Sequence, residues 1–127
     1  MAYKSLGLPV TSTQPSILTP AIGMAVPVAA AGIYLVRLTG RYTASPTAAV
    51  GLYAPGEVHG RIVARDSYAE QHQSGMVAPL PGGTDVVFAG EFIVKAATSG
   101  QIVPGFASLT GTLHSCAMEY VKVGDDT

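Results

Sequence analysis

The residues of this chain that could do chemistry are few and stand in short, isolated groups. Glu57 and His59 are two positions apart, which on a β-strand places both side chains on one face, as a pair of metal ligands requires. No third ligand follows at a recognisable spacing. We therefore interpret the pair as ordinary surface residues, and we expect no metal and no cofactor.

A second group, His114, Ser115 and Cys116, invites comparison with a nucleophile and its base. Neighbours on a strand point to opposite faces, so His114 and Cys116 are expected to share one side and Ser115 to face the other. No third orienting group and no glycine elbow accompanies them. We interpret Cys116 as a small core residue.

Two other stretches resemble catalytic motifs less closely. The glycines of "LPGGTD" (80–85) lack the lysine and the strand–loop–helix context of a phosphate loop, so they predict a turn. Asp66 and Glu70 lie in a polar stretch without a convincing carboxylate partner, so a glycosidase is not indicated. The sequence therefore predicts a protein that is not an enzyme.

Composition limits the remaining classes. The 127 residues fit one domain, and 48% of them are hydrophobic while 12% are charged, against a usual charged share of about 25%. So few charges favour burial of part of the surface against other subunits, although a small, very apolar core is the open alternative. Lys and Arg are scattered and the net charge is −1, so no basic patch for nucleic acid is visible. The start of the chain lacks the features of a signal peptide, and we expect no secretory route.

The apolar stretch at residues 24–45 decides the fold class. Arg37, Arg41 and Pro27 interrupt it, so a membrane helix is not expected. From Ile33 onward the apolar residues alternate with period two, as in a half-buried strand. One face holds Tyr34, Val36, Leu38, Gly40 and Tyr42, and the other holds Arg37, Thr39, Arg41 and Thr43. Residues 84–97 repeat the pattern, with Val86, Phe88, Gly90, Phe92 and Val94 opposite Asp85, Glu91 and Lys95.

Shorter strands are predicted at 48–53, 58–65, 101–108 and 115–123, and a loop at 66–75. Pro104 within one of them indicates an edge position or a bulge. Strands joined by turns, without a convincing helix, predict an all-β sandwich or barrel. The stretches "GRYTASPTAAVGLYA" and "GEFIVKAATSGQIVPGFAS" are weakly similar, which either two Greek-key halves or chance would explain.

Residues 1–23 differ from the rest, with prolines at 9, 15 and 20 that oppose a helix and a central strand. We expect an extended N-terminal arm (1–23), a β domain (24–124) and a short tail (125–127). The arm is either a disordered leader or a strap laid over a neighbour, and its aliphatic residues favour the strap. A flexible strap predicts that deleting residues 2–20 leaves the β domain folded. Its predicted partner-binding residues are Leu6, Leu8, Val10, Ile17 and Leu18.

Three stretches together carry a resemblance: "VPVAAAGIYLVRLTGRYTAS", "FAGEFIVKAATSGQIVPGFAS" and "AMEYVKVGD". Over residues 24–124 the chain resembles small jelly-roll proteins of tailed-bacteriophage virions, most of all capsid decoration (cement) proteins. The resemblance implies a Greek-key jelly-roll sandwich of the tumour-necrosis-factor and C1q type. It further implies a structural protein on the capsid exterior, made in the host cytoplasm, which stabilises the major capsid protein lattice as a homo-oligomer, with a trimer favoured over a dimer.

A second function follows from the same resemblance. Related jelly rolls form trimeric fibre or tail heads that bind a host-surface ligand. The chain has no coiled-coil or fibre-repeat stalk, which favours decoration. A decoration protein would be present in hundreds of copies per particle, whereas a receptor-binding head would be rare.

Overall fold

The computed structural model describes residues 2–5, 7 and 9–125, and in this part of the chain every paired strand is antiparallel. The described residues contain no α-helix, so none is long and apolar enough to cross a membrane, and a single 3-10 turn, η1 (Ile22–Met24), interrupts the strands. The all-β prediction is confirmed. The strands are β1 (Ala2–Ser5), β2 (Val10–Ser12), β3 (Thr19–Pro20), β4 (Val26–Val28), β5 (Gly32–Tyr53), β6 (Gly56–Ala64), β7 (Ser67–Gln71), β8 (Leu80–Ala96), β9 (Gly100–Ala107) and β10 (Thr110–Asp125).

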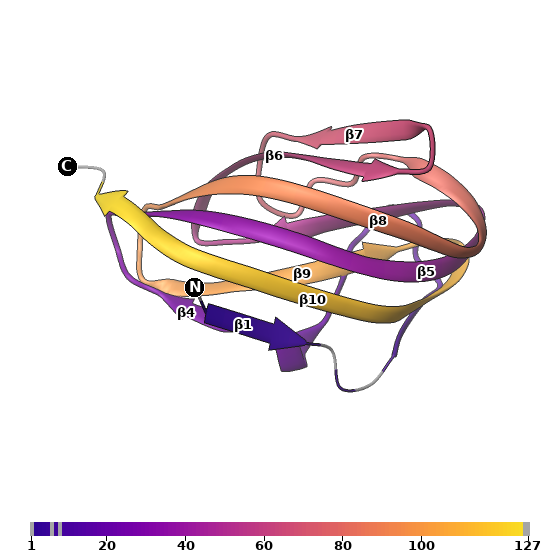
Figure 1. Cartoon of the computed structure of the whole chain (residues 1–127), viewed down its shortest axis with the longest axis horizontal. Helices are drawn as coiled ribbons and strands as arrows, with labels where there is room; N and C mark the ends of the chain where they lie inside the picture. Colours follow the sequence, from indigo (N-terminus) through magenta and orange to yellow (C-terminus); the bar gives the residue numbers. More distant parts are fainter. Residues whose placement is uncertain (1, 6, 8, 126–127) are drawn as a thin grey trace.

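Six strands form the larger layer, in the order β1-β10-β5-β8-β6-β7. Figure 1 shows them side by side, with β1 along the outer edge of β10. β2 pairs with the same edge, through Val10 opposite Leu113 and Ser12 opposite Gly111. The N-terminal segment therefore borders the chain's own last strand.

The smaller layer lies behind the larger one and is centred on β9 (Figure 1). One side of β9 pairs with β3 and β4, and the other side pairs with the end of β5. β5 belongs to both layers, because it pairs with β8 up to Ala48 and with β9 from Ala49 onward. Register shifts beside Ala44 mark the bend, and such irregularities let a strand turn from one sheet into another.

The core lies between the two layers and confirms the predicted alternation. On β5, Tyr34, Val36, Leu38 and Tyr42 are buried, while Arg37, Thr39 and Arg41 on the other face are exposed. On β8, Val86, Phe88, Phe92 and Val94 are buried, and Asp85 and Glu91 are exposed. The ring of Tyr42 lies 5.9 Å from that of Phe88 and 5.7 Å from that of Phe106 on β9, so aromatic contacts join the layers.

The loop predicted at 66–75 is wrong in its first half. Residues 67–71 form β7, which pairs with β6 through Ile62 opposite Ala69 and Gly60 opposite Gln71. The polar composition of this strand hides it, because the buried face carries the amide of Gln71 instead of an aliphatic side chain.

Pro104 lies where two ladders of β9 meet. On one side of β9, β4 pairs as far as Ile102 and β3 begins at Gly105, so Pro104 is between them. Its carbonyl accepts a hydrogen bond from the backbone N–H of Ala21, at 2.8 Å. A proline is tolerated here because no ladder partner on this side needs its missing N–H.

Candidate functional site

The described part of the predicted arm is extended but packs closely on the rest of the chain. Ser12 is 1% exposed, and its hydroxyl donates to the carbonyl of Ser108, at 3.2 Å. The same oxygen accepts from the N–H of Ser108, at 3.2 Å, and the Ser108 hydroxyl donates to the Thr47 carbonyl, at 2.9 Å. These bonds join β2 to the β9–β10 turn, and the boundary predicted at residue 23 does not coincide with a break in packing.

The predicted partner-binding residues separate into different environments. Leu6 and Leu8 lie outside the described residues. Val10 is partly buried against the core, and Leu18 has no exposed surface, because it packs among Ala49, Ala107 and Tyr53. Leu18 is therefore a core residue and has no free surface for a partner, whereas its neighbour Ile17 is 60% exposed.

A further exposed residue, Ile22, was missed by the sequence reasoning. It lies on η1 and is 76% exposed, the largest value among the exposed large apolar side chains of the described residues. It borders a groove of about 470 Å³ between η1 and the start of the chain, with Pro9, Val10 and Ala21 also in its wall. The candidate partner surface of the arm is therefore Ile17, Ile22 and this groove. An isoleucine between an alanine and a glycine gives no periodic signal that would have identified it.

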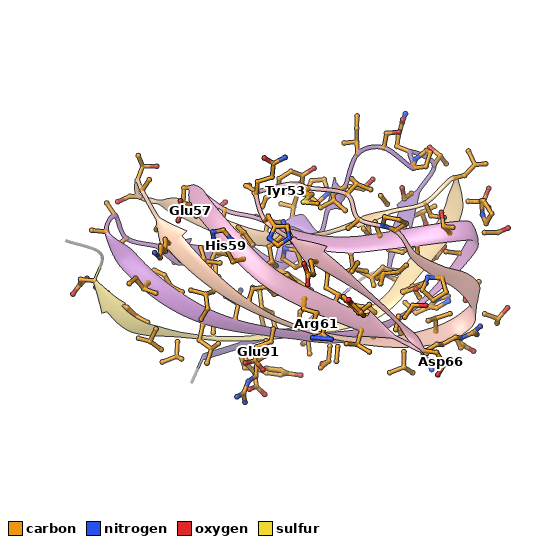
Figure 2. All side chains as sticks on the ribbon, turned by 90° about the horizontal axis from the view of Figure 1, so that it is seen from above. Tyr53, Glu57, His59, Arg61, Asp66 and Glu91 are labelled. Atoms are coloured by element: carbon orange, nitrogen blue, oxygen red, sulfur yellow. The ribbon has the colours of Figure 1, made fainter. Side chains whose placement is uncertain are left out.

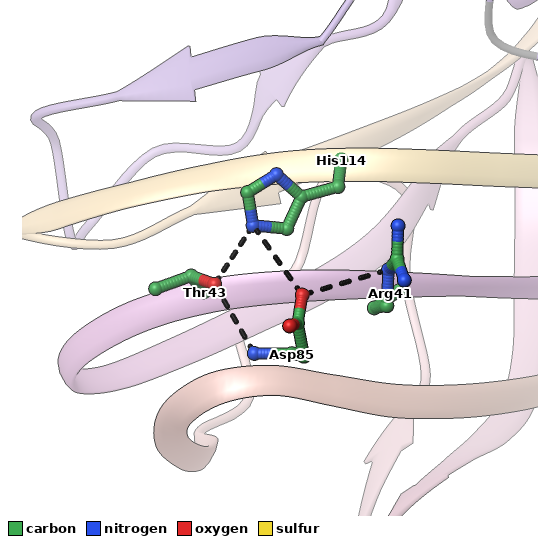
Figure 3. Close-up of polar contacts among 4 residues, drawn as sticks. All are labelled: Arg41, Thr43, Asp85 and His114. Atoms are coloured by element: carbon green, nitrogen blue, oxygen red, sulfur yellow. Dashed lines mark hydrogen bonds and ion pairs between the residues drawn. The ribbon is translucent and has the colours of Figure 1, made fainter.

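A polar cluster lies on the outer face of the larger layer, where β10, β5 and β8 run together (Figure 3). Thr43 Oγ1 lies 2.7 Å from His114 Nε2 and accepts from the backbone N–H of Asp85, at 3.1 Å. The Asp85 carboxylate lies 3.6 Å from Arg41 Nε and 4.0 Å from His114 Nε2. Asp85 has φ +49°, a left-handed conformation that non-glycine residues seldom adopt.

This cluster lacks the geometry of a catalytic triad. In a triad the hydroxyl meets one ring nitrogen and the carboxylate holds the other. Here Thr43 and Asp85 both approach Nε2 of His114, so the carboxylate does not orient the ring as a base. The arrangement joins three strands beside two register shifts, and we interpret it as structural.

The predicted arrangement of His114 and Cys116 is wrong. A register shift between Leu113 and Ser115 inserts His114 as a bulge, so His114 and Ser115 are both solvent-accessible while Cys116 is buried. His114 and Cys116 therefore do not share a face. Burial raises the pKa of the Cys116 thiol to about 12, so the thiolate needed for nucleophilic chemistry is scarce near neutral pH. Cys116 is a core residue, as predicted.

Glu57 and His59 lie on the same face of β6, as their spacing predicts, with His59 Nε2 3.8 Å from the Glu57 carboxylate (Figure 2). After β7, His72 brings its ring to 6.3 Å from that of His59 and its Nε2 to 3.2 Å from the Glu70 carboxylate. Within residues 2–5, 7 and 9–125, no group of three or more His, Cys, Asp or Glu side chains could hold a metal ion. The arrangement consists of two solvated imidazole–carboxylate pairs.

No family model matches the chain, and no curated protein matches it either.

Proposed function

We propose that the chain is a structural protein of a tailed-bacteriophage virion. In this proposal its two layers form a jelly-roll sandwich, and it decorates the capsid exterior by binding the major capsid protein lattice as a homo-oligomer. The two antiparallel layers and the long β5 shared between them support a sandwich of this kind. The low share of charged residues supports surfaces that are covered in an assembly.

The observation that carries the proposal is an anchored arm with exposed aliphatic side chains. The arm backbone is held by β10 and by Ser12, while Ile17 and Ile22 remain 60% and 76% exposed. An arm that is already ordered loses little conformational entropy when it binds. Complete burial of an isoleucine is worth about 1.5–3 kcal/mol, and an oligomer on a repeated lattice multiplies weak contacts by avidity.

Two measurements test the proposal. Gel densitometry of purified particles gives the copies of this chain relative to the major shell protein, and decoration predicts hundreds of copies per particle. A few copies would instead support the trimeric fibre or tail head. Binding to capsids that lack the chain is expected to fall at least about tenfold for Ile17→Ser combined with Ile22→Ser.

Leu109→Ser is the matched control, because Leu109 is 55% exposed in the turn before β10 and lies outside the arm. This variant is expected to bind capsids as the unaltered chain does. Unchanged binding by the double isoleucine variant would contradict the role of the arm.

A further inference from the structure

The outer face of the larger layer, turned away from β9, carries exposed apolar side chains, and one of them, Tyr68, has Arg61 over its ring at 4.3 Å from the centroid. Those exposed there are Tyr3 at 62%, Val63 at 45%, Tyr68 at 57%, Val87 at 67% and Ile93 at 38%. They come from the edge strand β1 and from β8, β6 and β7 on the other side of the sheet. Exposed apolar side chains gathered on one face mark an interaction surface.

One row of residues crosses all six strands in register and alternates in charge. In sheet order it consists of Tyr3, Glu119, Arg37, Glu91, Arg61 and Glu70, one from each strand. We call it the charged row. Within it, Arg37 Nε lies 3.6 Å from the Glu91 carboxylate, and Arg61 lies beside Glu91 (Figure 2).

A second row lies two residues along the strands and is uncharged. It consists of Ser5, Ala117, Thr39, Ala89, Val63 and Tyr68 in the same order, and we call it the uncharged row. Its small residues stand on β1, β10, β5 and β8, and its large ones on β6 and β7. A shallow depression of about 410 Å³ lies over Thr39 and Ala89, with Val63 in its wall.

We propose that this face binds a second copy of the chain about a two-fold axis that runs along the strands, midway between β5 and β8. This axis is the centre of the six-stranded order, so it places β5 on β8, β10 on β6 and β1 on β7 of the other copy. Each row then faces its own counterpart. A two-fold contact of this kind needs a surface that is complementary to itself.

The charged row meets that requirement. The axis sets Arg37 opposite Glu91 of the second copy and Arg61 opposite Glu119, and symmetry repeats both pairs. An axis through β8 instead would set Glu91 against Glu91, so charge selects a position between strands. Arg37 and Glu91 also pair within each chain. Near the axis, each of these charges therefore has an opposite charge both beside it in its own chain and facing it in the second copy.

The uncharged row is complementary in size. The same axis sets Val63 opposite Ala117 and Tyr68 opposite Ser5, so the large side chains of each copy face the small ones of the other. Two stacked sheets pack about 10 Å apart, a distance that large–small pairs can fill. Near the axis, Thr39 of one copy faces Ala89 of the other, over the depression.

The face has the size of a stable interface. Six strands about 4.8 Å apart, with five outward residues along β8, span roughly 700 Å². A typical stable complex buries about 800 Å² per partner. The inference does not depend on the proposed function, and a two-fold pair can coexist with a trimer only if the trimer forms through other surfaces.

Sedimentation equilibrium of the full chain tests the proposal. The unaltered protein is expected to form a dimer at micromolar concentration. Arg61→Glu alone and Glu119→Arg alone are each expected to weaken it by more than about tenfold, since like charges then face each other twice. Mixing the two variants is expected to restore a 1:1 dimer, because each facing pair is again of opposite charge.

The mixture isolates the contact between chains. Arg61 and Glu119 are three strand spacings apart in one chain, roughly 14 Å, so neither directly compensates the other there. Gln101→Glu mixed with Gln101→Lys is the control, since Gln101 is exposed on β9 in the other layer; both variants should dimerise as the unaltered chain does. Circular dichroism establishes that every variant is folded. A monomeric unaltered chain, or a mixture no tighter than its components, would overturn the proposal.

Discussion

The side-chain amide of Gln71, on β7, forms hydrogen bonds with both the backbone N–H and the backbone carbonyl of Leu52, near the end of β5. Its Oε1 accepts from the Leu52 N–H at 2.9 Å, and its Nε2 donates to the Leu52 carbonyl at 2.7 Å. A third bond runs from Nε2 to the carbonyl of Gln73, at 2.9 Å. The side chain is 1% exposed. The Leu52 carbonyl also accepts from the backbone N–H of Gly75, at 2.9 Å, whereas the Leu52 N–H has Gln71 as its partner.

Replacing Gln71 by leucine should therefore be strongly destabilising. The variant leaves the buried N–H of Leu52 without its partner, and an unsatisfied buried group costs about 1–3 kcal/mol. We expect the free energy of unfolding to fall by roughly 3 kcal/mol in urea titrations. His72→Ala is the neighbouring control, because that side chain is exposed, and it should change stability by less than about 0.5 kcal/mol. A Gln71→Leu variant as stable as the unaltered chain would show that water or another group satisfies Leu52.

The stability of the fold should also fall at alkaline pH. Burial raises the pKa of Tyr42 to about 12, against an ordinary 10.0, with a smaller opposite effect from Arg65. Between these values the unfolded chain has lost the phenolic proton and the folded chain keeps it, so the free energy of unfolding decreases as pH rises. The Cys116 thiol, raised from 9.0 to about 12, acts in the same direction.

Urea unfolding from pH 9 to pH 12 measures this effect. One unit of pKa is worth about 1.4 kcal/mol, so Tyr42 should account for roughly 2 kcal/mol of the loss. Tyr42→Phe removes the titrating group together with its hydrogen bond to the Pro81 carbonyl, so it should be less stable at pH 8 but lose less between pH 10 and pH 12. A Tyr42→Phe variant with the same pH dependence as the unaltered chain would show that other groups control the alkaline loss.

The long strands could be predicted from sequence because one face of each is buried. Tyr34 to Tyr42 and Val86 to Val94 alternate with period two, and this pattern fixes which face meets the core. β7 could not be predicted, because the burial of Gln71 depends on Leu52, nineteen positions away. The bulge at His114 was also hidden, since a bulge is defined by the register of the partner strand.

In the arm, too, the sequence does not predict which of two adjacent residues is buried. Ile17 and Leu18 are equally apolar in the sequence, yet one is 60% exposed and the other has no exposed surface. The hydroxyl of Tyr53 donates to the Leu18 carbonyl, at 2.5 Å, and Leu18 packs under β5 and β9. Tertiary contacts therefore decide which side chain enters the core. The prolines predict the extended backbone and leave this choice open.

This difference gives a paired test of the arm. Leu18→Ala should lower the free energy of unfolding by about 2–5 kcal/mol, as large-to-small core substitutions do, whereas Ile17→Ala should change it by less than about 0.5 kcal/mol. Deleting residues 2–20 removes Leu18, the Ser12 network and β1 to β3, so we expect a large loss of stability, in contrast to the independent β domain that the prolines suggested.

Deleting only residues 2–5 is the control for the truncation, because it removes the edge strand β1 and leaves Ser12 and Leu18 in place. Because β1 also lies on the proposed dimer face, the three proteins are compared at a concentration where the full chain is monomeric. There we expect this shorter deletion to unfold near the midpoint of the full chain in urea, and the longer one far below it. Equal midpoints for the full chain and the 2–20 deletion would mean that Leu18 and Ser12 add nothing to the core. The segment would then be a separable strap, and its exposed Ile17 would be free to bind without any cost to the fold.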